Sequence, residues 1–180
     1  MVKAVDLFGK NGIPLHISVI LGLDSHTYPD SFFWTRWALE QSNPLHVFFH
    51  IATSYPGTVW GKKVASEGRL LDVPSSDYNH RRVVFYPKQM TEKELYQGWL
   101  WLQRQQYSRE QMALTRVKHN QPQITRRNLL LGLALDGTLW GWENRLGLAE
   151  LQIRGLVDNQ IQRQLDHNYQ LWKKEKGLSK

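Results

Sequence analysis

The sequence predicts an α/β fold: a parallel β-α-β unit near the start of the chain, followed by an all-helical extension. Two segments, 13–23 and 45–53, alternate apolar and mixed positions with a period of two, as strands with one buried face do. The segment between them is long enough for a helix-bearing crossover and too long for a hairpin, which predicts parallel pairing. Beyond Pro122 only helical patterns are present.

The two predicted strands each have an apolar face and a mixed face. The apolar face is formed by Ile13, Leu15, Ile17, Val19, Leu21 and Leu23 in the first strand and by Leu45, Val47, Phe49 and Ile51 in the second. The mixed face carries His16, Ser18, Ile20, Gly22, His46, Phe48, His50 and Ala52. We expect helices to cover the apolar face and the mixed face to line a wet cavity.

Helices are predicted around this unit from their periodicity and caps. Residues 2–10 read as the end of a helix, and 29–41 as the crossover helix with Pro29 in its first turn. Thr58 is placed to cap a short helix that runs through Glu67 and is closed by Gly68. The sequence 91–94 is a capping box that begins a helix of about sixteen residues.

The rest of the chain gives weaker patterns. Residues 83–85 are a short strand candidate, and 108–118 a helix. Leu129–Leu135 reads as packed core, and a long polar helix is predicted over 148–175 with a thin apolar seam. The seam consists of Leu151, Val157, Ile161, Leu165 and Trp172.

Composition excludes several kinds of chemistry. The chain of 180 residues has no cysteine, which excludes disulfides, thiol nucleophiles and cysteine-held metal or iron–sulfur sites. Its net charge is +7, and residues 91–180 carry fourteen Lys or Arg against nine Asp or Glu. Such a basic half suits nucleic acid, an anionic membrane or plain solvation. With no signal peptide or membrane-spanning run in the sequence, we expect a cytoplasmic protein.

The order of the motifs resembles a known family. The succession of strand, Gly22-Leu23-Asp24, helix, strand, Ile51-Ala52-Thr53-Ser54-Tyr55-Pro56-Gly57-Thr58 and helix is similar to the last two βα units of a radical S-adenosylmethionine barrel. The likeness is to the cobalamin-binding branch, which includes hopanoid methylases and anaerobic magnesium-protoporphyrin cyclases. The segments 82–91, 94–99 and 106–108 resemble the region after the barrel, and the likeness covers about residues 1–110 in order.

The resemblance implies a fold and a site. The two strands would be the fifth and sixth of a partial (β/α)6 barrel, with residues 1–70 its last two βα units, 71–120 the post-barrel segment and 121–180 a helical extension. In the family these strands flank the adenine of S-adenosylmethionine. Carried over to this chain, the cofactor-binding residues are Ile20, Gly22, Asp24, His50, Thr53, Tyr55, Pro56 and Gly57. Gly22 would let a ligand approach the backbone.

The chain also departs from the family pattern. The Cys-x3-Cys-x2-Cys loop that binds the 4Fe-4S cluster is absent, so this chain's own motifs do not bind the cluster that radical chemistry requires. The cobalamin motif Asp-x-His-x-x-Gly is absent too, because Pro29 stands at the glycine position after Asp24 and His26. We therefore expect a C-terminal portion without radical activity alone, with no catalytic or metal-binding residue assigned. A split gene, a truncated paralogue and a dissected domain all fit.

Two kinds of partner and one rival function follow. A split protein would pair with a separate chain that carries the N-terminal, cluster-binding half, and the unpaired edge of the first strand would otherwise promote self-association. The rival is a basic helical adaptor for nucleic acid or a membrane surface. His46 and His50 lie about 13 Å apart along one strand, too far to bind one ion together. A serine triad based on Ser18 or Ser54 lacks the nucleophile-elbow motif.

Overall fold

The computed structural model describes residues 16–42, 46–105 and 156–178, together with Ala4, Leu7, Phe8 and Asn11. The elements are, in order, β1 (His16–Leu21), α2 (Asp30–Ser42), β2 (His46–Ile51), α3 (Val59–Ser66), a 3-10 turn (Ser75–Asp77) and α6 (Asn159–Glu175). Residues 92–105, before α6, are also helical and are called the 92–105 helix.

The two strands form a parallel sheet, as predicted. His16 pairs with His46 and the register runs without a bulge to Leu21 opposite Ile51. Helix α2 connects them, so the first part of the chain is a β-α-β unit. The fold is therefore mixed α/β.

The apolar face of the sheet is buried, as its alternation predicts. Val47, Phe49 and Ile51 are buried, and Leu21 is buried opposite Ile51. Ile17 and Val19 pack against the same core. The prediction for Leu23 was wrong: it lies beyond the end of β1, where strand alternation no longer applies, and is 40% exposed.

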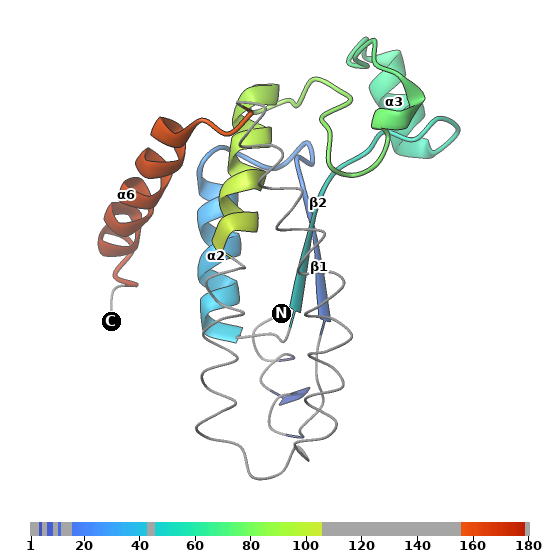
Figure 1. The fold of residues 1–180 in the computed structure, drawn as a ribbon. Helices are drawn as coiled ribbons and strands as arrows, with labels where there is room; N and C mark the ends of the chain where they lie inside the picture. Colours follow the sequence, from blue (N-terminus) through green and yellow to red (C-terminus); the bar gives the residue numbers. More distant parts are fainter. Residues whose placement is uncertain are drawn as a thin grey trace.

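Helices lie against the sheet in two successive layers. Helix α2 and the 92–105 helix run side by side next to the strands, and α6 lies outside them (Figure 1). Phe32 of α2 packs so close to Gly98 that a Cβ there would lie 2.5 Å from its ring. Phe33 of α2 contacts Trp101 and Tyr169 at ring-centroid distances of 5.5 Å, and thereby joins the inner helices to α6.

Two predicted caps are confirmed. The Thr58 hydroxyl accepts a hydrogen bond of 3.0 Å from the Gly61 amide at the start of α3. The Thr91 amide donates to the Glu94 carboxylate at 2.7 Å, and the Glu94 amide donates to the Thr91 hydroxyl at 3.2 Å. This reciprocal pair is the capping box that the sequence predicted.

Other predicted elements are corrected. Residues 83–85 do not form a strand; Phe85 makes one isolated antiparallel bridge to Leu70, because Pro87 ends the extended segment at once. Helix α6 begins at Asn159, because the Asp158 carboxylate accepts from the amides of Gln160 and Ile161 and caps it there; the predicted helix was continuous through 156–158, which is wrong, and its first residues, 148–155, lie outside the described residues. The helix at 108–118 and the core segment 129–135 lie outside the described residues, as does most of the helix at 2–10.

Within the described part of the chain, no helix combines the length and apolar character needed to cross a bilayer. The predicted boundaries between the segments 1–70, 71–120 and 121–180 stay predictions.

Candidate functional site

The mixed face of the sheet brings together two of the predicted site residues. Ile20 of β1 is in register with His50 of β2, so both side chains project from the same face. Ile20 is 52% exposed, in contrast to its buried neighbour Leu21. The Phe48 and His50 rings stack at 6.4 Å, which adds an aromatic surface beside Ile20.

Two further predicted residues, Thr53 and Tyr55, meet at the carboxyl end of β2 around a residue that was not predicted, His80. The Thr53 hydroxyl oxygen lies 3.3 Å from His80 Nδ1, and the Tyr55 hydroxyl oxygen lies 3.1 Å from His80 Nε2. The His80 ring also contacts the His50 ring at 5.4 Å. We call His50, Thr53, Tyr55 and His80 the His80 cluster; it adjoins the mixed face of the sheet.

The backbone holds His80 in this position. The Ile51 amide donates a hydrogen bond of 2.8 Å to the His80 carbonyl, which attaches the loop to the outer edge of β2. His80 has a φ of 63°, a left-handed conformation that is uncommon for a residue other than glycine. The Tyr55 hydroxyl donates to the Tyr78 carbonyl at 3.0 Å and fixes the loop at a second point. Strained positions of this kind gather at functional sites.

The charge of the His80 cluster is set by histidine and arginine. Burial lowers the pKa of His50, and the neighbouring His80 and Arg81 lower it further. Among the described residues, no carboxylate lies within ion-pair distance of His80 or Arg81. The cluster therefore favours a neutral or negatively charged ligand over a cation.

The remaining predicted site residues lie apart from the His80 cluster or act structurally. Gly22 has a φ of 88°, and a Cβ there would lie 2.6 Å from Leu95 Cδ2, so it packs against the 92–105 helix and not against a ligand space. Pro56 and Gly57 are exposed in the turn after β2. The structure thus brings together Ile20, His50, Thr53 and Tyr55 out of the eight.

Asp24 is engaged in ion pairs. Its carboxylate lies 3.0 Å from Arg69, 3.1 Å from Lys63 and 3.8 Å from Lys88. Burial alone would raise the pKa of Asp24, but the hydrogen bond from Lys63 and the positive charges of Arg69, Lys63 and Lys88 lower it. Asp24 therefore anchors β1 to the region around α3.

Metal and triad chemistry find no support in the described residues. They contain no group of three or more His, Cys, Asp or Glu residues placed to hold a metal ion. The buried Ser54 hydroxyl has no hydrogen-bond partner there, so no histidine activates it. The side chain of His46 is outside the description.

The sequence does not predict His80 as a site residue, for a physical reason. It lies in a polar loop with no periodicity, and only the folding of residues 71–90 back onto the end of β2 brings it to Tyr55. The Asn79-His80 pair is a weak turn signal, since Asn tolerates turn conformations. It says nothing about where the turn lies.

The comparisons with known proteins do not identify the chain: no protein-family model, curated protein or solved structure matches it.

Proposed function

We propose that the chain is the C-terminal part of a radical S-adenosylmethionine-type protein, and that it supplies one wall of a nucleoside-binding site. The observation that carries the proposal is the placement of Ile20, His50, Thr53 and Tyr55 at the carboxyl ends of two parallel strands. In α/β folds with parallel strands, ligands bind outside this end of the sheet.

The edges of the sheet support the assignment of β2 as the last strand of a partial barrel. The Phe49 carbonyl, on the edge away from β1, accepts hydrogen bonds from the side chains of Trp99 at 2.9 Å and Gln103 at 3.4 Å. The Ile51 amide on the same edge donates to His80. Side chains and a loop thus occupy the edge that another strand would use. The outer edge of β1 makes no such contacts within the described residues.

The chemistry of this wall suits a nucleoside. Ile20 and the stacked pair Phe48 and His50 offer an apolar and aromatic surface for a planar base. The hydroxyls of Thr53 and Tyr55 supply polar groups that fix orientation. S-adenosylmethionine is the cofactor that the family resemblance implies, and a partner chain with the cysteine motif would hold the cluster, since this sequence has no cysteine.

The direct test is titration of the full chain with S-adenosylmethionine and S-adenosylhomocysteine, with cytidine as a control. Isothermal titration calorimetry measures the affinity, and we expect saturable binding of the two adenosyl compounds. Ile20→Lys places a charge on the mixed face at an exposed position and should weaken binding at least about tenfold. Trp34→Lys, at a position 45% exposed on α2, is the matched control and should bind as the parent does. Equal affinity of both variants would overturn the proposal.

The partner requirement has its own test. Reconstitution of the chain alone with iron, sulfide and reductant should give no stoichiometric cluster, whereas co-expression with a Cys-bearing N-terminal half should give a stable complex. A cluster on the isolated chain would contradict the proposal.

The adaptor function receives less support. Lys173, one of the basic residues at the end of α6, lies 3.6 Å from the Glu40 carboxylate and 5.1 Å from the centre of the Tyr169 ring, so it packs within the molecule. Lys174 and Lys176 are exposed, as solvated helix ends usually are.

A further inference from the structure

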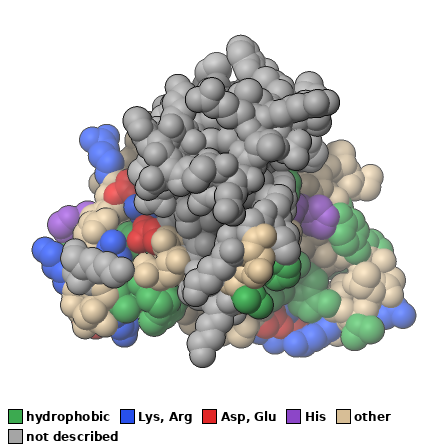
Figure 2. Space-filling view, turned by 90° about the horizontal axis from the view of Figure 1, so that it is seen from below, with side chains coloured by type: hydrophobic (Ala, Val, Ile, Leu, Met, Phe, Trp, Pro, Cys, Tyr) green, Lys and Arg blue, Asp and Glu red, His purple; other side chains and the backbone are tan. Residues whose placement is uncertain are grey.

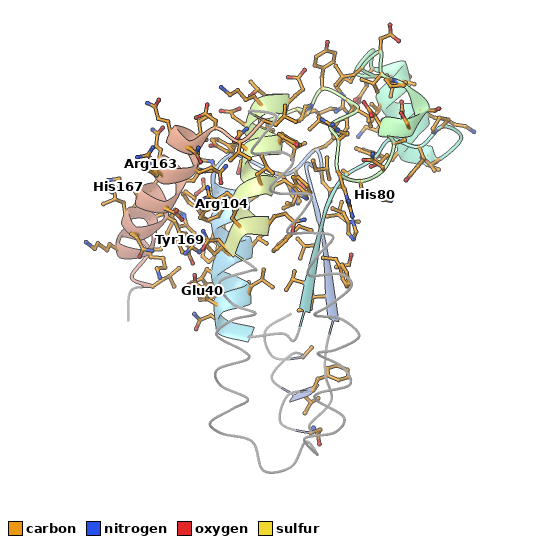
Figure 3. The ribbon with its side chains drawn as sticks, viewed as in Figure 1. Glu40, His80, Arg104, Arg163, His167 and Tyr169 are labelled. Atoms are coloured by element: carbon orange, nitrogen blue, oxygen red, sulfur yellow. The ribbon has the colours of Figure 1, made fainter. Side chains whose placement is uncertain are left out.

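Helix α6 has one side that packs against the molecule and one that faces solvent. The inward side consists of its buried residues, Gln162, Leu165, Tyr169 and Trp172. The residues on the opposite side are all exposed, and we call them the outer face of α6: Gln160, Arg163, Gln164, His167, Gln170, Leu171 and Lys174. Arg163 and His167 lie on the side of the helix away from α2 (Figure 3). Solvent therefore reaches the outer face along the length of the helix.

The outer face of α6 carries a line of basic and hydrogen-bonding side chains. Arg163, His167, Gln170 and Lys174 recur at helical spacing, so they fall within an arc of about 60° around the axis. The two cations at its ends, Arg163 and Lys174, are about 16 Å apart along the axis. Arg163 Nε donates to the Asn159 carbonyl at 3.3 Å, which leaves its two terminal nitrogens without a bond to any described residue.

The carboxylates of α6 and of its cap lie away from this line. Asp166 accepts a hydrogen bond of 3.2 Å from Arg36 of α2. Asp158 caps the helix and lies 3.3 Å from Lys93. Glu175 is exposed, but it is about 80° or more around the helix from every member of the line. The line itself therefore has a positive charge.

The composition of the outer face suits a nucleic acid better than a bilayer. A helix that lies on a membrane buries an apolar face in it, whereas the large apolar residues of α6 face inward except Leu171, which is 50% exposed. Basic side chains contact phosphates, and glutamine can both donate to and accept from base edges. Basic and histidine side chains gather at the edge of the molecule where α6 lies (Figure 2).

We propose that the outer face of α6 binds duplex DNA, with the helix lying across the major groove. This groove is about 12 Å wide and admits an α-helix, so the two ends of the line reach the phosphates on either side. His167 and the glutamines then face the base edges. Duplex RNA fits less well, because its major groove is too narrow for side chains to read. The net charge of +7 favours association with a polyanion.

DNA binding would add to the proposed function and does not depend on it. The nucleoside wall belongs to the strands, and α6 lies outside the inner helices that cover them (Figure 1). Loss of DNA binding would therefore leave nucleoside binding intact, and the reverse also holds.

The test is fluorescence anisotropy of a labelled DNA duplex of about 20 base pairs, titrated with the full chain at several salt concentrations. We expect saturable binding with a dissociation constant below about 100 µM. The logarithm of the association constant should fall against the logarithm of salt concentration with a slope of about −2, because each of the two cations contributes about −0.9. No saturable binding, or a slope near zero, would overturn the proposal.

Two other polyanions are titrated in parallel. They are an RNA duplex of the same sequence and vesicles of phosphatidylglycerol and phosphatidylcholine in equal parts. We expect both to bind more weakly than the DNA duplex. Tighter binding to either one would overturn the assignment of DNA as the partner.

Variants separate the outer face from general charge. Arg163→Gln and Lys174→Gln should each bring the slope closer to zero by about one and weaken binding about five- to tenfold at about 0.1 M salt. Arg163→Lys should keep the slope. Lys62→Gln removes the same charge at an exposed position on α3, on the other side of the molecule from α6 (Figure 1), and should bind as the parent does. All three positions are exposed, so circular dichroism should show an unchanged fold. Equal losses in Lys62→Gln and Lys174→Gln would contradict the proposal.

Discussion

The indole N–H of Trp99 donates a hydrogen bond of 2.9 Å to the carbonyl oxygen of Phe49. Both residues are buried, and the bond crosses from the 92–105 helix to the outer edge of β2. In a strand, successive residues direct their polar backbone groups to opposite edges; the Ala52 amide donates to Leu21 of β1, so the odd-numbered groups of β2 point outward. Trp99 thus satisfies a buried carbonyl that no strand reaches in the described structure.

Trp99→Phe tests the energetic importance of this bond. It keeps a buried aromatic ring but leaves the Phe49 carbonyl with the longer bond from Gln103, so we expect a loss of about 1–3 kcal/mol in the free energy of unfolding. The measurement is urea denaturation followed by circular dichroism. Trp34→Phe, at a half-exposed position on α2, should cost less than about 1 kcal/mol. Equal losses in the two variants would mean that the bond contributes nothing.

Gly22 gives a second prediction, because two constraints act on it. Gly22→Ala should lose about 2–4 kcal/mol of stability, since its φ of 88° disfavours a side chain and its Cβ would lie 2.6 Å from Leu95. Gly57 has a similar φ of 85° with nothing within 4 Å, so Gly57→Ala isolates the backbone cost of about 1 kcal/mol. If both substitutions cost the same in thermal and urea unfolding, the contact with Leu95 is not the constraint.

Features that join residues close in sequence could be predicted, and those that join distant residues could not. The caps at Thr58 and Thr91 were predictable because they join residues three apart in the chain. The strand faces were predictable because successive side chains of a strand project to opposite faces, so the alternation of apolar residues shows which face is buried. The burial of Gln97 and Gln162 was not predictable, because glutamine usually lies on the surface. Only when α6 packs against the 92–105 helix does the side-chain amide of Gln162 donate to the backbone carbonyl of Gln97, at 3.0 Å.

The same distinction applies to the residues of the candidate site. Strand alternation and the resemblance brought Ile20 and His50 to one face, and the register confirms that they are neighbours. Asp24 was assigned as a ligand contact from the family resemblance, yet the positive charges that engage it come from Lys63, Arg69 and Lys88. Those partners are distant in sequence, so no local pattern could predict the ion pairs.

His50 makes stability depend on pH. Its folded-state pKa is lowered from 6.5 by burial, and by His80 and Arg81, so the unfolded chain takes up the proton first. The free energy of unfolding is therefore unaffected by His50 above pH 6.5 and falls as the pH drops through 6.5 toward the lower folded value. His50→Gln should make this decline shallower but not abolish it, because burial also lowers the pKa of His26. Urea midpoints over this range provide the measurement, and parallel profiles of His50→Gln and the parent chain would refute the assignment.

The outer edge of β1 yields the last prediction, on self-association. Leu21 accepts from Ala52 of β2, so Ser18 and Ile20 direct their amides and carbonyls to the opposite edge, where no described residue bonds them. Exposed edges of this kind pair with other strands, and proline is tolerated there because the missing N–H is not part of the ladder. We expect the parent chain to sediment faster as its concentration rises, and Ser18→Pro to stay at the monomer value with a stability change below about 1 kcal/mol. Val19→Pro removes an amide that faces β2 and should destabilise the fold by about 3 kcal/mol or more. Undiminished association of Ser18→Pro would place the contact elsewhere on the molecule.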